Sequence, residues 1–186
     1  MIYLWTEDTG AGLHFWQLIN NYYFGEKLIV ESKHSNQGLL DAVRKLEPKE
    51  DDVYYLAFDI VYDNQDVVNK LLDLKQEIKK YPNQLHLLDL TCFEEIILKF
   101  DKLIEWTGTG RKDKIKFREY ILEALSNHRI DIAKISDEKT LNYLMNFKNM
   151  TTERVIKSIT YELTDGDKWS IRGEKWGSVG MKIVVY

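Results

Sequence analysis

The sequence predicts an α/β fold in which a central, mostly parallel sheet of about four strands is flanked by helices. Over roughly the first 90 residues, short apolar runs alternate with amphipathic stretches of 12–16 residues. This order is typical of βαβ units with right-handed crossovers. After Cys92 the alternation gives way to helical periodicity, which predicts a C-terminal helical extension.

Four segments have the apolar and β-branched character of buried strands. They are residues 2–6, 27–30, 53–61 and 85–90. The third is the strongest, because nearly every residue from Val53 to Val61 is β-branched, aromatic or aliphatic. These segments predict the strands of one parallel sheet.

Helical spacing of apolar side chains predicts a helix after each of these strands. Gly10 and Gly12 are expected in a turn before the first helix, Gly25 ends that helix, and Ser35 or Asn36 caps the second. Further along, Pro48 and Pro82 follow the second and third helices. The predicted helices cover residues 13–24, 36–46, 65–80, 93–106, 112–125, 137–147 and 151–163.

Charge and size divide the chain near residue 92. At 186 residues with 44% hydrophobic side chains, it is long enough for one domain with an appendage. Residues 1–92 carry 9 basic and 15 acidic side chains, whereas residues 93–186 carry 17 and 15. We therefore expect an acidic α/β domain over 1–92 and a mildly basic helical extension over 93–186. The extension ends in an aromatic-rich tail that alternates weakly and predicts a β-hairpin or an edge strand.

Acidic side chains follow all four predicted strands. Because the carboxyl ends of parallel strands form the ligand-binding edge of such a sheet, we expect these acids at one edge. Asp59 stands out because it interrupts an apolar run, where an ionised carboxylate is costly unless it is paired or bound. The acids are Glu7 and Asp8, then Glu31, then Asp59 and Asp63, and finally Asp89, Glu94 and Glu95.

Crowded carboxylates repel one another unless some are protonated or a cation lies between them. Oxygen ligands of this kind suit Mg²⁺ or Mn²⁺, and such an ion can bind phosphate and activate water. We predict that Glu7 and Asp59 are metal-binding and catalytic residues, and that Asp63 assists them. The alternative is that acids at these positions cap the helices that follow.

The pattern over residues 1–92 resembles the Toprim domain of topoisomerases, primases and OLD-type nucleases. In that family a Glu ends the first strand before a Gly-containing turn, and an Asp-x-Asp motif ends the third strand. Glu7, Gly10 and Gly12 match the first feature, and Asp59 matches the first aspartate; Asp63 stands four positions later rather than two. The resemblance implies a Mg²⁺-dependent, nuclease-like protein that acts on or binds nucleic-acid phosphodiesters.

A second resemblance implies a different class of function. Response-regulator receiver domains have an acidic pair after the first strand, an Asp after the third and a Thr or Ser after the fourth. Glu7-Asp8, Asp59 and Thr91 fit this pattern, but no fifth strand with a terminal Lys is evident. The alternative function is therefore a non-catalytic regulatory or protein-interaction module, receiver-like or a degenerate Toprim domain, that dimerises or docks a partner.

A basic cluster follows the Gly108-Thr109-Gly110 turn. Its side chains would hold a nucleic-acid backbone if they lie beside the acidic edge, or form a solvated helix face if they do not. The cluster comprises Arg111, Lys112, Lys114, Lys116 and Arg118. Trp106, Trp169 and Trp176 are candidates for a protein interface, including that of a homodimer.

The remaining features concern the compartment. Cys92, the only cysteine, cannot form an internal disulfide, which fits a reducing cytosol. The first ten residues lack the features of a signal peptide, and no apolar run approaches 18 residues. We expect a cytoplasmic protein with no membrane partner.

Overall fold

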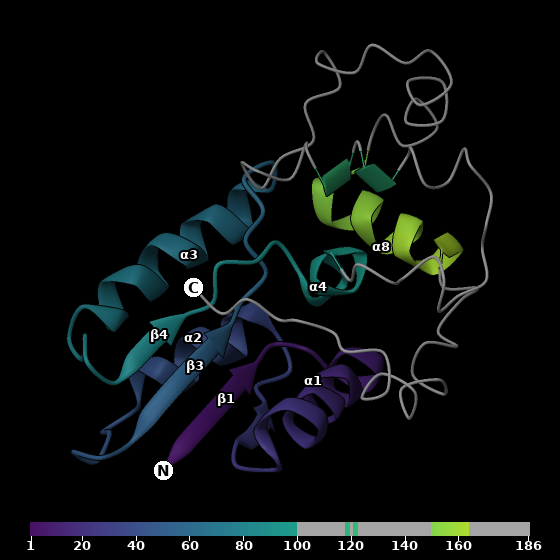
Figure 1. Ribbon diagram of the computed structural model, residues 1–186. Helices are drawn as coiled ribbons and strands as arrows, with labels where there is room; N and C mark the ends of the chain where they lie inside the picture. The colour runs from purple at the N-terminus through teal and green to yellow at the C-terminus, as the bar shows by residue number, and fades with distance from the viewer. Residues whose placement is uncertain (100–117, 120, 123–149, 164–186) are drawn as a thin grey trace.

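In a computed structural model of the chain, the structure describes residues 1–99, 118–119, 121–122 and 150–163 (Figure 1). Four parallel strands form one sheet, as the sequence predicts. The strands are β1 (Ile2–Thr6), β2 (Ile29–Ser32), β3 (Val53–Ala57) and β4 (Leu85–Leu87). The helices are α1 (Gly10–Phe24), α2 (Asn36–Arg44), α3 (Gln65–Ile78), α4 (Phe93–Lys99) and α8 (Thr152–Leu163).

The strand order is β2-β1-β3-β4. From β1 to β2 the chain moves one way across the sheet, and from β2 through β3 to β4 it moves the other way. With right-handed crossovers, this reversal puts α1 on one face and α2 and α3 on the other. The reversal also makes the gap between the carboxyl ends of β1 and β3 a topological switch point, where open α/β sheets bind ligands.

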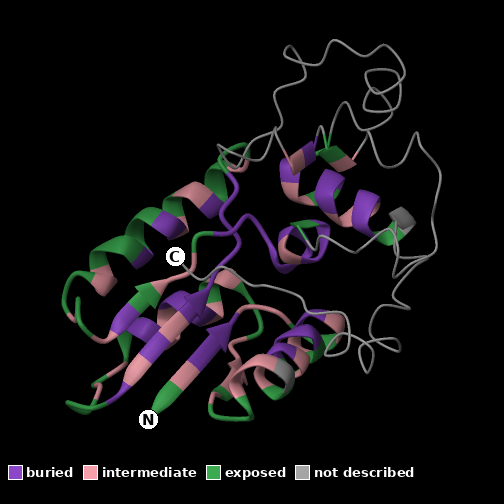
Figure 2. Cartoon of the chain, in the orientation of Figure 1, coloured by how far each residue is buried: buried purple, intermediate pink, exposed green. Residues whose placement is uncertain are grey.

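Two apolar cores lie on the two faces of the sheet. Because side chains alternate along a strand, Leu4 packs with α1, α4 and α8, whereas Trp5 packs with α2 and α3. Figure 2, a cartoon coloured by burial, shows buried segments along these helices and along β1 and β3. The described elements therefore form three layers, helix, sheet and helix.

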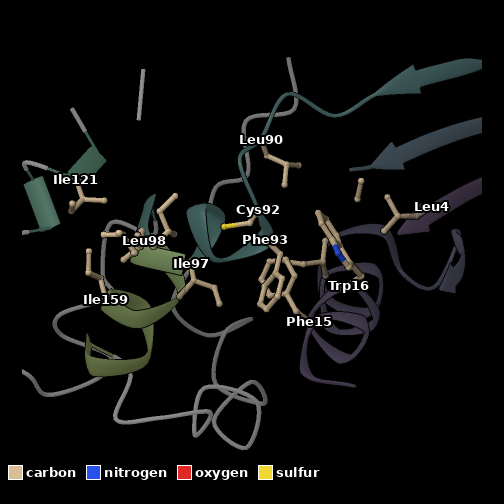
Figure 3. Close-up of a cluster of buried hydrophobic side chains, with 14 residues drawn as sticks. Leu4, Phe15, Trp16, Leu90, Cys92, Phe93, Ile97, Leu98, Ile121 and Ile159 are labelled. Carbon is tan, nitrogen blue, oxygen red and sulfur yellow. The ribbon is translucent and has the colours of Figure 1, made fainter. Parts of the chain in front are cut away.

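The first core joins the two sides of residue 92. After β4 the chain crosses to the α1 face, where the rings of Phe15 and Phe93 lie 5.2 Å apart between their centroids. Ile97 and Leu98 of α4 then pack in the same cluster as Ile159 of α8 (Figure 3). The described part of the extension thus shares its core with the α/β domain.

Several boundaries differ from the sequence expectation, and one of them is β2, which covers Ile29–Ser32 rather than residues 27–30. The turn predicted at Gly10 and Gly12 is wrong, because α1 begins at Gly10, whose φ of 52° lets the chain enter the helix directly. Strand β3 ends at Ala57 rather than Val61, and β4 ends at Leu87 rather than Leu90. The apolar run from Phe58 to Val61 reflects burial under α2 and α3 rather than strand pairing.

Other predicted boundaries are confirmed. Gly25 ends α1 in the left-handed conformation, and the hydroxyl of Ser35 caps α2 by accepting a bond from the amide of Gly38. The predicted helix over 151–163 is α8. The expected helix over 137–147, most of that over 112–125 and the alternating tail lie outside the described residues. No helix within the described ranges is long and apolar enough to cross a membrane.

Truncating a core leucine tests the second core. Leu56 is fully buried on the α2/α3 face, so Leu56→Ala should lower the free energy of unfolding by about 2–5 kcal/mol. Leu72 of α3 is 56% exposed, and Leu72→Ala should cost less than about 1 kcal/mol. Urea unfolding measures both values, and equal losses would contradict the packing described.

Candidate functional site

A cleft of about 430 Å³ opens at the carboxyl ends of β1 and β3, at the switch point. Polar and charged side chains from α4, α8 and the segments after β1 and β3 meet there, beside the first turns of α1 and α2. The charged side chains that line the cleft are Glu7, Asp8, Asp59, Glu94, Glu153 and Lys157. Five carboxyl groups and one ammonium therefore share this space.

Glu7 and Asp59 are in direct contact. Thr6 pairs with Ala57 at the end of the β1–β3 ladder, so the residues just beyond these strands are also neighbours. The backbone N–H of Asp59 donates to Oε1 of Glu7 at 2.6 Å. The side-chain amide of Asn36, in the first turn of α2, lies against the same carboxylate, and turning this amide over would let its nitrogen donate to Glu7. The structure thus brings together the two acids that the sequence singled out.

Asp8 points to a different set of partners. Its Oδ2 accepts hydrogen bonds from the Thr6 hydroxyl at 2.7 Å and from Nε1 of Trp16 at 2.8 Å. A Cβ at position 12 would lie 2.6 Å from Oδ1 of Asp8, so Gly12 allows α1 to begin against this carboxylate. Asp8 therefore connects β1 to α1 and borders the cleft.

Asp59 is 6% exposed and faces a cation from a distant part of the chain. Its Oδ2 lies 3.6 Å from Nζ of Lys157 on α8. The same ammonium is bonded to Glu153, one turn earlier on α8. An acidic side chain after β3 is thus joined electrostatically to a helix almost a hundred residues later.

Glu94 adds a second buried carboxyl group to the cleft, beside that of Asp59, from the first turn of α4. It is 8% exposed, and its Oε2 has no hydrogen-bond partner among the described residues. Its neighbour Glu95 is also buried, but it accepts a bond from the Thr91 amide at 2.6 Å and pairs with Lys99. Glu95 therefore caps α4, whereas Glu94 faces the cleft.

Burial dominates the electrostatics of the cleft. Loss of solvent raises the pKa of Glu7 to about 7 and the pKa of Glu94 to about 7. Burial, together with the nearby charge of Glu7, also raises the pKa of Asp59. Burial alone would lower the pKa of Lys157, but the carboxylates of Asp59 and Glu94 outweigh it and raise that pKa. The cleft therefore favours bound cations and protons.

Asp63 lies apart from this group. Its Oδ2 accepts two bonds from Thr152, from the backbone N–H and from the hydroxyl, both at 2.7 Å. Asn64, not Asp63, caps α3 by accepting from the amide of Asp66. Asp63 thus holds the beginning of α8, the helix that carries Glu153 and Lys157.

Little of the predicted basic cluster falls within the described residues. Arg111, Lys112, Lys114 and Lys116 lie outside them. The Nε–H of Arg118 donates to the carbonyl of Leu98 near the end of α4.

Sequence reasoning missed Glu153 and Lys157. Their four-residue spacing is that of an ordinary salt bridge on a solvated helix face, so no sequence signal marked them. Glu94 was correctly predicted to follow the fourth strand, but the sequence did not show that it lines the same cleft as Asp59.

Two further findings bear on the function of the site. Among the described residues, no group of three or more His, Cys, Asp and Glu side chains is arranged to hold a metal ion by itself. Comparison with protein-family models, with curated proteins and with solved structures finds no match to this chain. The function is therefore inferred from the geometry and charge of the cleft.

Substituting Glu94 tests the cost of burying its carboxylate. Between pH 4.5, the usual pKa of Glu, and about 7, the folded chain holds a proton there that the unfolded chain has lost. The free energy of unfolding should therefore fall as pH rises through this window, by roughly 3 kcal/mol for this group. Glu94→Gln should remove that part of the pH dependence and raise the melting temperature at pH 8, measured in EDTA. An unchanged pH profile would contradict the prediction.

Removing the Asp63 carboxylate tests the attachment of α8. Asp63→Ala loses both bonds to Thr152 and should lower the free energy of unfolding by about 1–2 kcal/mol. Amide hydrogen exchange should rise along residues 152–163. Asp66→Ala is the control, because Asp66 is exposed and its ion-pair partner in the described ranges is Lys70 alone, and its loss should cost less than about 0.5 kcal/mol. Equal effects of the two substitutions would argue against an anchoring role.

Proposed function

We propose that the chain acts on nucleic-acid phosphodiesters with a divalent cation, Mg²⁺ or Mn²⁺, bound in the cleft at the switch point. One observation carries this proposal: Glu7 and Asp59, from neighbouring strands, are in contact at the edge where open α/β sheets bind ligands. A Glu at the end of the first strand and an Asp after the third are also the features shared with the Toprim domain. This agreement supports a Toprim-like activity of the nuclease type.

The donor set suits a hard cation that keeps part of its water. Mg²⁺ is commonly held by one or two carboxylates, with waters and substrate phosphates completing its shell. Glu7 and Asp59 would supply those carboxylates, so a closed group of three protein ligands is not required. When bound, the ion would polarise the phosphate and activate water. The Asp59 N–H orients the Glu7 carboxylate, and Asp63 contributes by holding α8 rather than by reaching the cleft.

The surroundings of the carboxylates support a phosphate-bearing substrate. The first turns of α1 and α2 both border the cleft, and helix N-termini attract phosphate through their free N–H groups. Thr9, which precedes α1, makes no side-chain cap bond there. The basic residues at 111–118 would extend the contact along a nucleic-acid backbone.

The second candidate is a non-catalytic regulatory or protein-interaction module, acting by dimerisation or partner docking. It is favoured by the ammonium of Lys157, which already offsets part of the charge of Asp59. A protein that binds Mn²⁺ but cleaves neither DNA nor RNA, and that light scattering shows to be a dimer, would favour this candidate.

Nuclease assays test the proposal. We expect cleavage of DNA or RNA in Mg²⁺ or Mn²⁺ and none in EDTA. Asp59→Asn should reduce the rate by more than the roughly 10–100-fold typical of losing an outer partner of a metal site. Asp51→Asn is the matched control, because Asp51 is exposed at the opposite end of the same strand. Metal-independent cleavage, or equal rates for the two variants, would overturn the proposal.

A further inference from the structure

Lys157 lies in the cleft as an internal cation. It is the one lysine or arginine among the described residues that line this space. Its Nζ is bonded to Glu153 and lies 3.6 Å from Oδ2 of Asp59. The side chain remains 39% exposed, so its stem reaches inward from the surface of α8 and places only the charged end among the acids.

Glu94 supplies a second, independent observation. It is more than nine-tenths buried and lines the cleft, and its Oε2 has no hydrogen-bond partner in the described part of the chain, although Cys92 is bonded to the Glu94 side chain. A buried carboxylate oxygen without a donor is costly, and a nearby positive charge offsets that cost. Lys157 interacts electrostatically with Glu94 as well as with Asp59.

We propose that Asp59 serves two cation positions. The first, shared with Glu7, takes the divalent ion of the proposed function, on which this inference rests. The second, shared with Glu94 and Glu153, is filled by the ammonium of Lys157.

The chemistry of phosphodiesters explains why a second positive charge would be useful here. In two-metal sites, paired ions stabilise both the attacking and the leaving oxygen of an in-line displacement. A lysine ammonium is a compact point charge that can contact phosphate. One divalent ion with Lys157 would therefore supply two positive charges while the chain binds a single metal ion.

Calorimetric titration with Mn²⁺ at one fixed pH tests this assignment by counting ions. The wild-type chain should bind one Mn²⁺. Lys157→Met removes the ammonium and should bind two, because Asp59, Glu94 and Glu153, which are not arranged as a metal site around the ammonium, then lack a cation and can close around a second ion. Lys157→Arg keeps the charge and should bind one. The double variant Lys157→Met with Glu94→Gln loses a ligand of the second position and should return to one.

The difference in the number of bound Mn²⁺ ions between the wild type and Lys157→Met tests the inference. The number of Mn²⁺ ions bound by the wild type tests the proposed function. An unchanged count in Lys157→Met would overturn the inference and leave the proposed function standing. A wild-type chain that binds no Mn²⁺, beside a Lys157→Met variant that binds one, would support the second position and overturn the first.

A folding defect in Lys157→Met would not end the test. The variant would then be refolded with and without millimolar Mn²⁺ and followed by circular dichroism. Refolding only with Mn²⁺ supports the inference, because the ion replaces the lost charge and stabilises the fold by mass action. Failure to refold in Mn²⁺, while the double variant folds, would contradict it.

Discussion

The parallel pairing of β1 with β3 is the constraint on which the cleft depends. Because the chain reverses direction across the sheet between these strands, the connections described after β1 and β3 lead to opposite sides and leave a gap at their carboxyl ends. The register that pairs Thr6 with Ala57 brings the next residues into contact, so the Asp59 amide meets the Glu7 carboxylate. A shift of register by one residue would turn Leu4 and Trp5 toward the wrong faces of the sheet. The two cores that stabilise the fold therefore also hold the two acids together.

Concentrating carboxyl groups at this point opposes folding. Removing an ionised carboxylate from water costs several kcal/mol unless a partner compensates, and the cleft contains two buried carboxyl groups, Asp59 and Glu94, and a partly buried one, Glu7. The chain offsets the cost in two visible ways. The backbone N–H of Asp59 donates to Glu7, and the ammonium of Lys157 lies beside Asp59 and offsets part of the charge of Glu94. Oε2 of Glu94 still has no hydrogen-bond donor among the described residues, and this residual cost favours a bound cation as the reason for the arrangement.

Helix α8 makes the cleft a product of both parts of the chain. Asp63 binds Thr152 at the start of the helix, while Ile156 and Ile159 pack in the same core as α1 and α4. These contacts aim Glu153 and Lys157 at the end of the sheet rather than at solvent. After β4 the chain crosses to the α1 face of the sheet. This crossing places α4 beside the switch point, so that Glu94 lines the cleft. The acidic α/β domain is thus completed by the mildly basic extension.

The sequence by itself determined the α/β class, the four strand positions, the Ser35 and Gly25 helix ends and the candidacy of Glu7 and Asp59. These follow from local causes: apolar periodicity, cap chemistry, and the rule that acids after parallel strands share one edge. The extents of β3 and β4 were overestimated, because an apolar run records burial whether or not it pairs. Only the tertiary structure decided that Asp63 holds α8 and that Glu94, Glu153 and Lys157 face Asp59. Those contacts join residues up to about a hundred positions apart, and local pattern carries no information on which distant side chains will meet.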